Sequence, residues 1–170
     1  MGHIYIKNFQ KIKPVSFSGA FFRSVSLKHS GEIIDTEGSF EHGGRYNPMR
    51  EFGALYMSAS KEVCKKEITQ KQREAFLGPR IIGQIKVSVT KLLDLTNTGN
   101  LKKLGIKKED LIRDKDKGGW TLTWEMARLA YNTGYEAILS PSVTSKGSNL
   151  VVFDKSLSTT KIALLSKTQE

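Results

Sequence analysis

The sequence predicts one α+β domain in which a mixed or largely antiparallel sheet is flanked by helices. Six short apolar runs are typical of strands, and two longer segments with helical spacing occur among them in no regular alternation. That order favours an α+β fold over a parallel α/β fold. The 170 residues, of which 38% are hydrophobic, can bury one continuous core, so we expect a single domain over residues 1–170.

The predicted strands are short runs of β-branched, aromatic and other apolar residues. They span residues 20–25, 54–58, 80–89, 137–139, 150–153 and 162–165. Two residues in these runs are candidates for a functional site, Arg23 in the first run and Tyr56 in the second. Taken alone, each has a structural interpretation: a salt bridge at a strand edge for the arginine, and a core phenol with a bonded hydroxyl for the tyrosine.

Two helices are predicted from their spacing and their end signals. The first spans residues 60–76, where Ser60 is the expected N-cap and the Gly-Pro step ending at Pro79 lies beyond its end. The second spans residues 121–132 and stops at Gly134. Its apolar residues Met126, Leu129 and Ala130 recur at helical spacing.

Glu67 lies on the first predicted helix, beside the inward stripe that Val63 and Cys64 mark. Burying an unpaired carboxylate costs roughly several kcal/mol, so a carboxylate on such a face must form an ion pair, accept hydrogen bonds or take part in catalysis. One interpretation is a structural salt bridge to Arg23 or Arg45. The other is a catalytic carboxylate, and the helical pattern leaves both open.

Residues 43–48, Gly-Gly-Arg-Tyr-Asn-Pro, are predicted to form a tight turn. Gly43 and Gly44 permit backbone angles and a close ligand approach that side chains would block, and Pro48 fixes the exit of the loop. Arg45 is thereby presented from a stiff loop. A planar guanidinium held in this way suits phosphate recognition, although paired glycines also mark plain hairpin turns.

The formal net charge is +10, and 15 of the 27 lysines and arginines lie between residues 61 and 120. This group includes Lys102, Lys103, Lys107 and Lys108, which we place in a loop region. Scattered lysines usually form a solvated surface, which would also attract an acidic partner protein or a polyphosphate substrate. No aromatic residues are interleaved with them for base stacking, so nucleic acid is a disfavoured partner.

Several classes of protein are excluded by what the sequence lacks. It has no apolar run of about 18 residues and no secretory signal, so we expect no membrane contact and a cytoplasmic protein, or one delivered into a target cell without a conventional signal peptide. Cys64 is the single cysteine, and no histidines have metal-ligand spacing. We therefore expect no disulfide and no metal.

The order of these motifs resembles the RES domain family, named for its Arg, Glu and Ser. The resemblance covers roughly residues 20–154. The matching motifs are Phe22-Arg23, Gly43-Gly44-Arg45-Tyr46-Asn47-Pro48, Ala54-Leu55-Tyr56-Met57-Ser58, Glu67 eleven residues beyond the tyrosine, Ser140-Pro141-Ser142 and Gly147-Ser148-Asn149-Leu150-Val151-Val152-Phe153. The resemblance implies a fold similar to diphtheria-toxin-type ADP-ribosyltransferases and the toxin role of bacterial Xre–RES toxin–antitoxin pairs.

The family's catalytic residues carry over to three positions of this sequence. Arg23 matches the arginine, Glu67 the glutamate and Ser142 the serine, with Ser140 as the alternative one register away. In the reaction that the resemblance implies, the Glu67 carboxylate would stabilise the sugar cation formed when nicotinamide leaves NAD, which is electrostatic catalysis. Ser142 would orient a substrate hydroxyl or support Glu67.

Three further positions match the family's substrate pocket. Arg45 would clamp the diphosphate together with Arg23, and Tyr56 would pack against nicotinamide or ribose. Tyr46 stands where the family usually has tryptophan, which bears on substrate preference. No Gly-x-Gly-x-x-Gly loop is present, so NAD is expected as a substrate in a pocket unlike that of dinucleotide-binding dehydrogenases, with no resident cofactor and with inorganic phosphate as a candidate second substrate.

The expected function is therefore an NAD-degrading toxin that cleaves the bond between nicotinamide and ribose by hydrolysis or phosphorolysis. One alternative is an ADP-ribosyltransferase that modifies a protein or nucleic acid, and another is a non-catalytic, basic nucleic-acid-binding module. The expected partner is a cognate antitoxin, or an immunity protein if the chain is delivered into rival cells.

Overall fold

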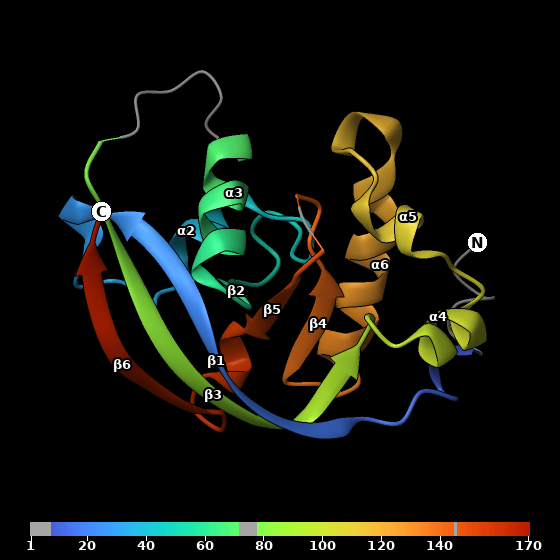
Figure 1. Ribbon diagram of the computed structural model, residues 1–170. Helices are drawn as coiled ribbons and strands as arrows, with labels where there is room; N and C mark the ends of the chain where they lie inside the picture. The colour runs from blue at the N-terminus through green and yellow to red at the C-terminus, as the bar shows by residue number, and fades with distance from the viewer. Residues whose placement is uncertain (1–7, 72–77, 145) are drawn as a thin grey trace.

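The computed structural model describes residues 8–71, 78–144 and 146–170, and within them the strands form one mixed sheet (Figure 1). The strands are β1 (Val15–Ser26), β2 (Ala54–Ser58), β3 (Arg80–Asp94), β4 (Ala137–Pro141), β5 (Ser148–Phe153) and β6 (Lys161–Gln169). Their order is β1-β2-β5-β4-β3-β6, and β1 also pairs with β3. Only β3 and β4 run parallel among these described pairs, which confirms the predicted α+β class.

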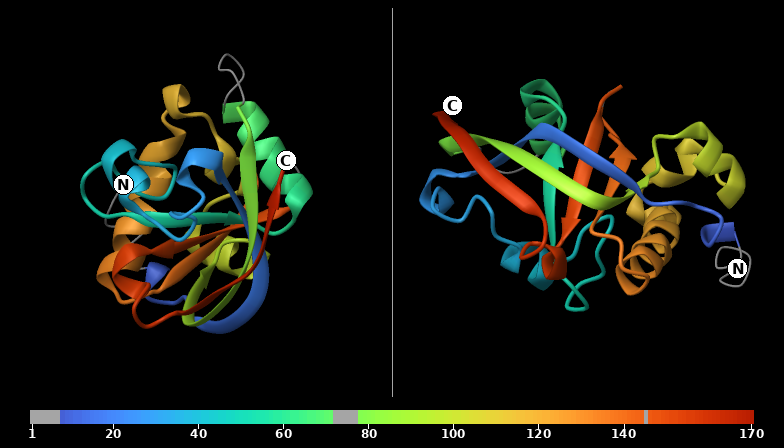
Figure 2. Two further views of the ribbon diagram at one scale, coloured as in Figure 1. Left: turned by 90° about the vertical axis from the view of Figure 1, so that its left-hand side faces the viewer. Right: turned by 90° about the horizontal axis from the view of Figure 1, so that it is seen from below.

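The extra pairing of β1 with β3 folds the sheet back on itself. The long strands β1, β3 and β6 run side by side and cross the shorter group of β2, β5 and β4 at an angle, as Figure 2 shows from below. All six predicted strands exist, and all except β2 are longer than predicted, most of all β1, β3 and β6. Their ladders continue past the apolar runs because partner strands satisfy the backbone while polar side chains face solvent.

Helices cover the short strands and connect them (Figure 1). They are α2 (Glu37–His42), α3 (Lys61–Lys71), α4 (Thr98–Leu104), α5 (Lys108–Ile112) and α6 (Gly119–Asn132), with the short 3-10 helices η1 (Leu27–His29), η2 (Lys115–Lys117) and η3 (Asp154–Ser156). The Oγ atom of Ser60 accepts a hydrogen bond of 3.1 Å from the Val63 amide, which confirms the predicted N-cap of α3. Residues 72–76 of that predicted helix lie outside the described residues.

The assignment of the lysine-rich segment to a loop was wrong. Lys102 and Lys103 lie in α4, Lys107 is the N-cap residue of α5, and Lys108 begins that helix. A periodic pattern is not detectable in this segment because the two helices span seven and five residues, about two turns or fewer. The Asn97 side chain accepts a hydrogen bond from the Asn100 amide and caps α4.

Two apolar clusters occupy the two faces of the short strands. One contains Ala54, Ile138, Val151 and Phe153 and packs under α4, α5 and α6. The other is formed by alternate residues of the same strands, such as Leu55 and Leu150, with β1 and β3. No described helix is both long and apolar enough to span a bilayer.

Candidate active site

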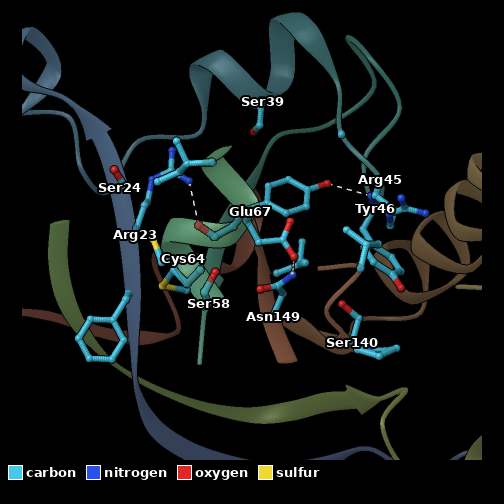
Figure 3. A pocket seen from close by; sticks show the side chains of 18 of the residues that line it. Arg23, Ser24, Ser39, Arg45, Tyr46, Ser58, Cys64, Glu67, Ser140 and Asn149 are labelled. Carbon is cyan, nitrogen blue, oxygen red and sulfur yellow. Dashed lines mark hydrogen bonds between the residues drawn. The ribbon is translucent and has the colours of Figure 1, made fainter. Parts of the chain in front are cut away.

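A cavity of about 570 Å³ lies where β1, β2 and β5 meet α3, the 43–46 turn and the start of α6. Its volume falls within the range of about 300–1,000 Å³ that is usual for sites binding organic ligands. Five of the six residues predicted for the site line it: Arg23, Arg45, Tyr46, Tyr56 and Glu67. In the view of Figure 3, Glu67 lies between Arg23 on one side and Arg45 on the other. The chain therefore gathers these groups at one cavity.

The floor of the cavity is a row of polar residues across three strands. Asn149 in β5 lies directly opposite Ser58 in β2 and opposite Ser140 in β4. Directly opposite residues point to the same face of a sheet, so the three side chains lie side by side. One step further along each strand on that face, the row contains Tyr56 and Val151 and is apolar apart from the phenol. The change from apolar to polar residues marks where the core ends and the cavity begins.

Glu67 reaches this floor from α3. Its Oε1 accepts a hydrogen bond of 2.5 Å from Ser142 Oγ and one of 2.9 Å from Asn149 Nδ2. The ion pairs among the described residues do not include Glu67, so the salt bridge to Arg23 or Arg45 that the sequence left open was the wrong interpretation. The carboxylate is instead held by two neutral donors, Ser142 and Asn149.

Ser142 lies behind Glu67 and is not among the residues that line the cavity. Its hydroxyl is fixed from the other side, because Oγ also accepts a hydrogen bond of 3.2 Å from the Thr144 amide and lies 3.1 Å from Thr144 Oγ1. Ser140 lines the cavity and points toward Tyr46 in Figure 3. Of the two candidate serines, Ser142 is thus the one bonded to the glutamate.

Arg23 is held in β1 by two backbone carbonyls. Nη1 donates to the carbonyl oxygen of Tyr56 at 3.1 Å, and Nη2 donates to that of Asp35 at 3.2 Å. Burial lowers the pKa of the guanidinium below its usual value, and the charges of Asp35 and Cys64 oppose this shift. Arginine remains protonated at neutral pH even so, and Arg23 supplies a fixed positive charge at the cavity wall.

Arg45 lines the cavity and also binds the C-terminal end of α5. Its Nη1 donates to the carbonyl oxygens of Leu111 at 3.1 Å and Arg113 at 2.6 Å, at the C-terminal end of α5, and its guanidinium lies 5.6 Å from the ring centre of Trp120. Burial lowers the pKa of Arg45, and the charges of Tyr46 and Glu67 oppose this shift. One of its nitrogens is therefore committed to capping a helix, in contrast to the free phosphate clamp expected from sequence.

The hydroxyl of Tyr56 fixes the glycine turn. It donates to Asn47 Oδ1 at 2.8 Å and accepts from the Tyr46 amide at 2.9 Å. Burial raises the pKa of this phenol above its usual value. A Cβ atom at Gly44 would lie 2.5 Å from the Tyr56 oxygen, so only glycine fits there. The ring of Tyr56 faces the cavity, whereas its hydroxyl has the structural role.

Buried polar atoms without a partner gather at this cavity. Within the described residues there are six, and four of them belong to residues that line it: Arg23 Nε, Tyr46 Oη, Trp120 Nε1 and Asn149 Oδ1. Burial raises the pKa of Tyr46 to about 12, while Ser140 and Arg45 reduce the rise. Folded proteins leave few such atoms, and they tolerate them mainly where function requires particular groups.

No site role was predicted from the sequence for four further residues that line the cavity, Trp120, Asn149, Ser58 and Cys64. A role for Asn149 could have been predicted from the pattern, because this polar residue directly precedes four buried apolar residues, 150–153, of the same strand. Trp120 gave no signal of this kind. Its ring lies against Arg45, which is remote in sequence, and its ring centre lies 4.9 Å from Lys115 Nζ.

Groups of three or more histidine, cysteine, aspartate or glutamate side chains that could hold a metal are absent from residues 8–71, 78–144 and 146–170. The expectation that the site uses no metal stays a prediction. The described residues that line the cavity provide two guanidinium groups, one carboxylate, and the hydroxyl and amide groups of its floor.

Comparison with known proteins finds a family likeness and a structural likeness. The model of the RES domain matches residues 21–167, which is most of the chain. Among solved structures, a chain of the crystal structure of the M. tuberculosis MbcT–MbcA toxin–antitoxin complex superposes with a TM-score of 0.81 at 20% identity, covering 98% of this chain and 92% of that chain. At this identity the likeness concerns the fold. No curated protein matches the sequence.

Proposed function

This chain belongs to the RES domain family, and from that premise we propose that it is a toxin that consumes NAD by cleaving the bond between nicotinamide and ribose. The observation that carries the proposal is the Glu67 carboxylate, held through one oxygen by Ser142 and Asn149 at a cavity whose walls also carry Arg23 and Arg45. A ligand that combines a cationic sugar centre with a diphosphate complements these charges.

Cleavage of the bond between nicotinamide and ribose requires little acid–base catalysis from the protein. Nicotinamide is attached to ribose as a positively charged pyridinium and leaves as a neutral molecule, so no strong general acid is required. Positive charge develops on the ribose as the bond breaks, and a fixed carboxylate beside it lowers the barrier through electrostatic stabilisation. Glu67 has this role in the proposal. Because neutral donors hold it, no salt bridge compensates its charge in advance.

The two arginines would attract and orient the diphosphate. Arg23 bonds two backbone carbonyls through its two Nη atoms, and Arg45 bonds two through Nη1 alone, so each guanidinium is fixed in place before a ligand arrives. Fixed charges hold a substrate in a reactive geometry without a further entropic cost at the moment of binding. In this arrangement the arginines act through charge and position, and they do not need to reorganise into a free bidentate clamp.

The acceptor of the ADP-ribosyl group in this proposal is water or inorganic phosphate, and a cognate antitoxin restrains the toxin. The matched fold comes from a complex between a toxin and an antitoxin, which supports a protein partner of that kind. The net charge of +10 would favour association with an acidic protein surface.

The test is nicotinamide release from NAD by the purified protein, measured by chromatography, with Glu67→Gln as the variant. We expect Glu67→Gln to lose nearly all turnover, whereas Glu62→Gln, the same change at an exposed position of the same helix, keeps it. Equal turnover by wild type and Glu67→Gln would refute the role of Glu67, and no nicotinamide release by the wild type would refute the reaction.

Product masses distinguish the acceptors. The reaction is run in buffers with and without inorganic phosphate. Phosphorolysis yields, only with phosphate, a product heavier than ADP-ribose by one phosphoryl group, whereas hydrolysis yields ADP-ribose in both buffers. Radiolabel from the adenine part of NAD that stays on a macromolecule would instead identify the transferase alternative.

A further inference from the structure

We infer that Asn149 is a positioning residue, one that fixes which carboxylate oxygen of Glu67 is presented to the substrate; this inference rests on the proposed function. Asn149 stands on the floor of the cavity, and its Nδ2 donates to Glu67 Oε1 at 2.9 Å. Figure 3 shows the two side chains pointing toward each other from β5 and α3.

Both donors to Glu67 converge on the same oxygen. Ser142 and Asn149 each bond Oε1, while none of the described residues donates a hydrogen bond to Oε2. The donors come from two neighbouring strands, one just beyond the end of β4 and the other at the start of β5, so two side chains together hold the one oxygen. Oε2 is therefore the carboxylate oxygen that can accept a hydrogen bond from a ribose hydroxyl or face a developing positive charge.

The amide of Asn149 is poorly explained by stability alone. Its Oδ1 is buried and has no hydrogen-bond partner among the described residues. Turning the amide over would give Oδ1 no better surroundings, because it would then face the Glu67 carboxylate. An unpaired buried acceptor costs free energy, and an apolar residue would continue the run of buried residues that starts at Leu150. The contact with Glu67 is the compensating gain that the structure offers.

The strand gives this amide a rigid base. Asn149 is paired with Ser58 on one side and with Ser140 on the other, so its backbone is fixed by two neighbouring strands. A side chain on a central strand holds its geometry more closely than one on a loop, which matters for a group that must place a carboxylate. Asn149 thus connects the sheet to Glu67 on α3.

Asn149→Ala is expected to lower kcat by about tenfold to a hundredfold, the scale of effect of a misplaced catalytic group, while KM changes by less than about threefold. The matched control is Ser148→Ala, one residue earlier on the same strand, where the side chain points to the other face of the sheet. Its kcat should stay within about twofold of the wild type. A KM increase without a kcat loss would overturn the inference.

A double-mutant cycle separates positioning from an independent contribution. If Asn149 acts through Glu67, the variant with both Glu67→Gln and Asn149→Ala should be no slower than Glu67→Gln alone, because the group being positioned is already gone. Effects that multiply would overturn the inference. Should Asn149→Ala fail to fold, Asn149→Asp preserves the shape and replaces the donor by an acceptor, and it enters the same cycle.

The failure of this inference can be told apart from the failure of the proposed function. If the wild type releases no nicotinamide, the reaction is refuted, and urea unfolding of the wild type, Glu67→Ala, Asn149→Ala and the double variant still measures the contact. A coupling free energy between the two positions is expected, and strictly additive changes would show that Asn149 does not hold Glu67.

Discussion

Ser142 Oγ lies 2.5 Å from Glu67 Oε1, although the two residues are 75 positions apart in the sequence. One stands just beyond β4 and the other on α3. The short distance is typical of a hydroxyl that donates to an ionised carboxylate. This bond decides between the two serines that the Ser-Pro-Ser segment offered, and it gives the chosen serine the role of holding the carboxylate.

Ser142→Ala should therefore lower nicotinamide release by about tenfold to a hundredfold, because Glu67 loses one of two donors on Oε1 and its carboxylate can move. Ser140→Ala, two residues earlier, keeps both donors to Glu67 and should lose less activity than Ser142→Ala. The measurement is kcat for nicotinamide release. Larger loss in Ser140→Ala than in Ser142→Ala would show that the assignment of the serine is reversed.

Arg45→Ala should reduce both stability and substrate affinity. The variant removes the donor to the carbonyl oxygens of Leu111 and Arg113, and hydrogen bonds from a charged group contribute about 1.5–3 kcal/mol. We expect the free energy of unfolding in urea to fall by about that amount and KM for NAD to rise. Arg113→Ala, which removes an exposed ion pair with Asp110, is the control and should cost less than about 1 kcal/mol. Unchanged stability of Arg45→Ala would contradict the capping role.

The candidate site residues and their grouping at one cavity could be predicted from the sequence, because the resemblance to the RES domain family assigns these positions to a common pocket. Arg23, Arg45 and Glu67 were found in this way and line that cavity. The second role of Arg45 could not be predicted, since its carbonyl partners lie 66 and 68 residues away on a helix too short to have a periodic signal. Asn149 was quoted within a motif, but its role depends on strand register, which the sequence pattern alone does not specify.

Gly44→Ala should destabilise the protein by about 1–3 kcal/mol, the usual cost of forcing atoms into a well-packed site. The added Cβ atom would lie 2.5 Å from the Tyr56 oxygen and 2.8 Å from Asn47 Oδ1. Combining Gly44→Ala with Tyr56→Phe removes the closest clash and should recover part of the loss. Gly38→Ala is the control, because nothing lies within 4 Å of its added Cβ atom. The measurement is Tm, and a Tm for Gly44→Ala equal to that of the control would show that the turn tolerates a side chain.

A pH-dependent contribution to stability is expected from Glu136, which lies just before β4 and is bonded to β3. Its Oε2 accepts hydrogen bonds from the Thr90 amide at 2.6 Å, the Lys91 amide at 2.9 Å and Thr90 Oγ1 at 3.0 Å. Burial raises the pKa of this carboxyl, but the hydrogen bonds from Lys91 and Thr90 together outweigh burial, so its pKa lies below the usual 4.5.

The lowered pKa fixes the sign of the effect. A carboxyl whose pKa is lower in the folded state than in the unfolded chain stabilises the fold above pH 4.5, and this contribution is lost as the pH falls through the folded-state pKa. Glu136→Gln should therefore lower Tm at pH 7, and the difference from the wild type should shrink steadily below pH 4.5. Glu109→Gln, a change at an exposed position of α5, is the control and should alter Tm little at either pH. A Tm difference for Glu136→Gln that persists undiminished to pH 2 would mean that the carboxylate charge is not what ties β3 to the start of β4.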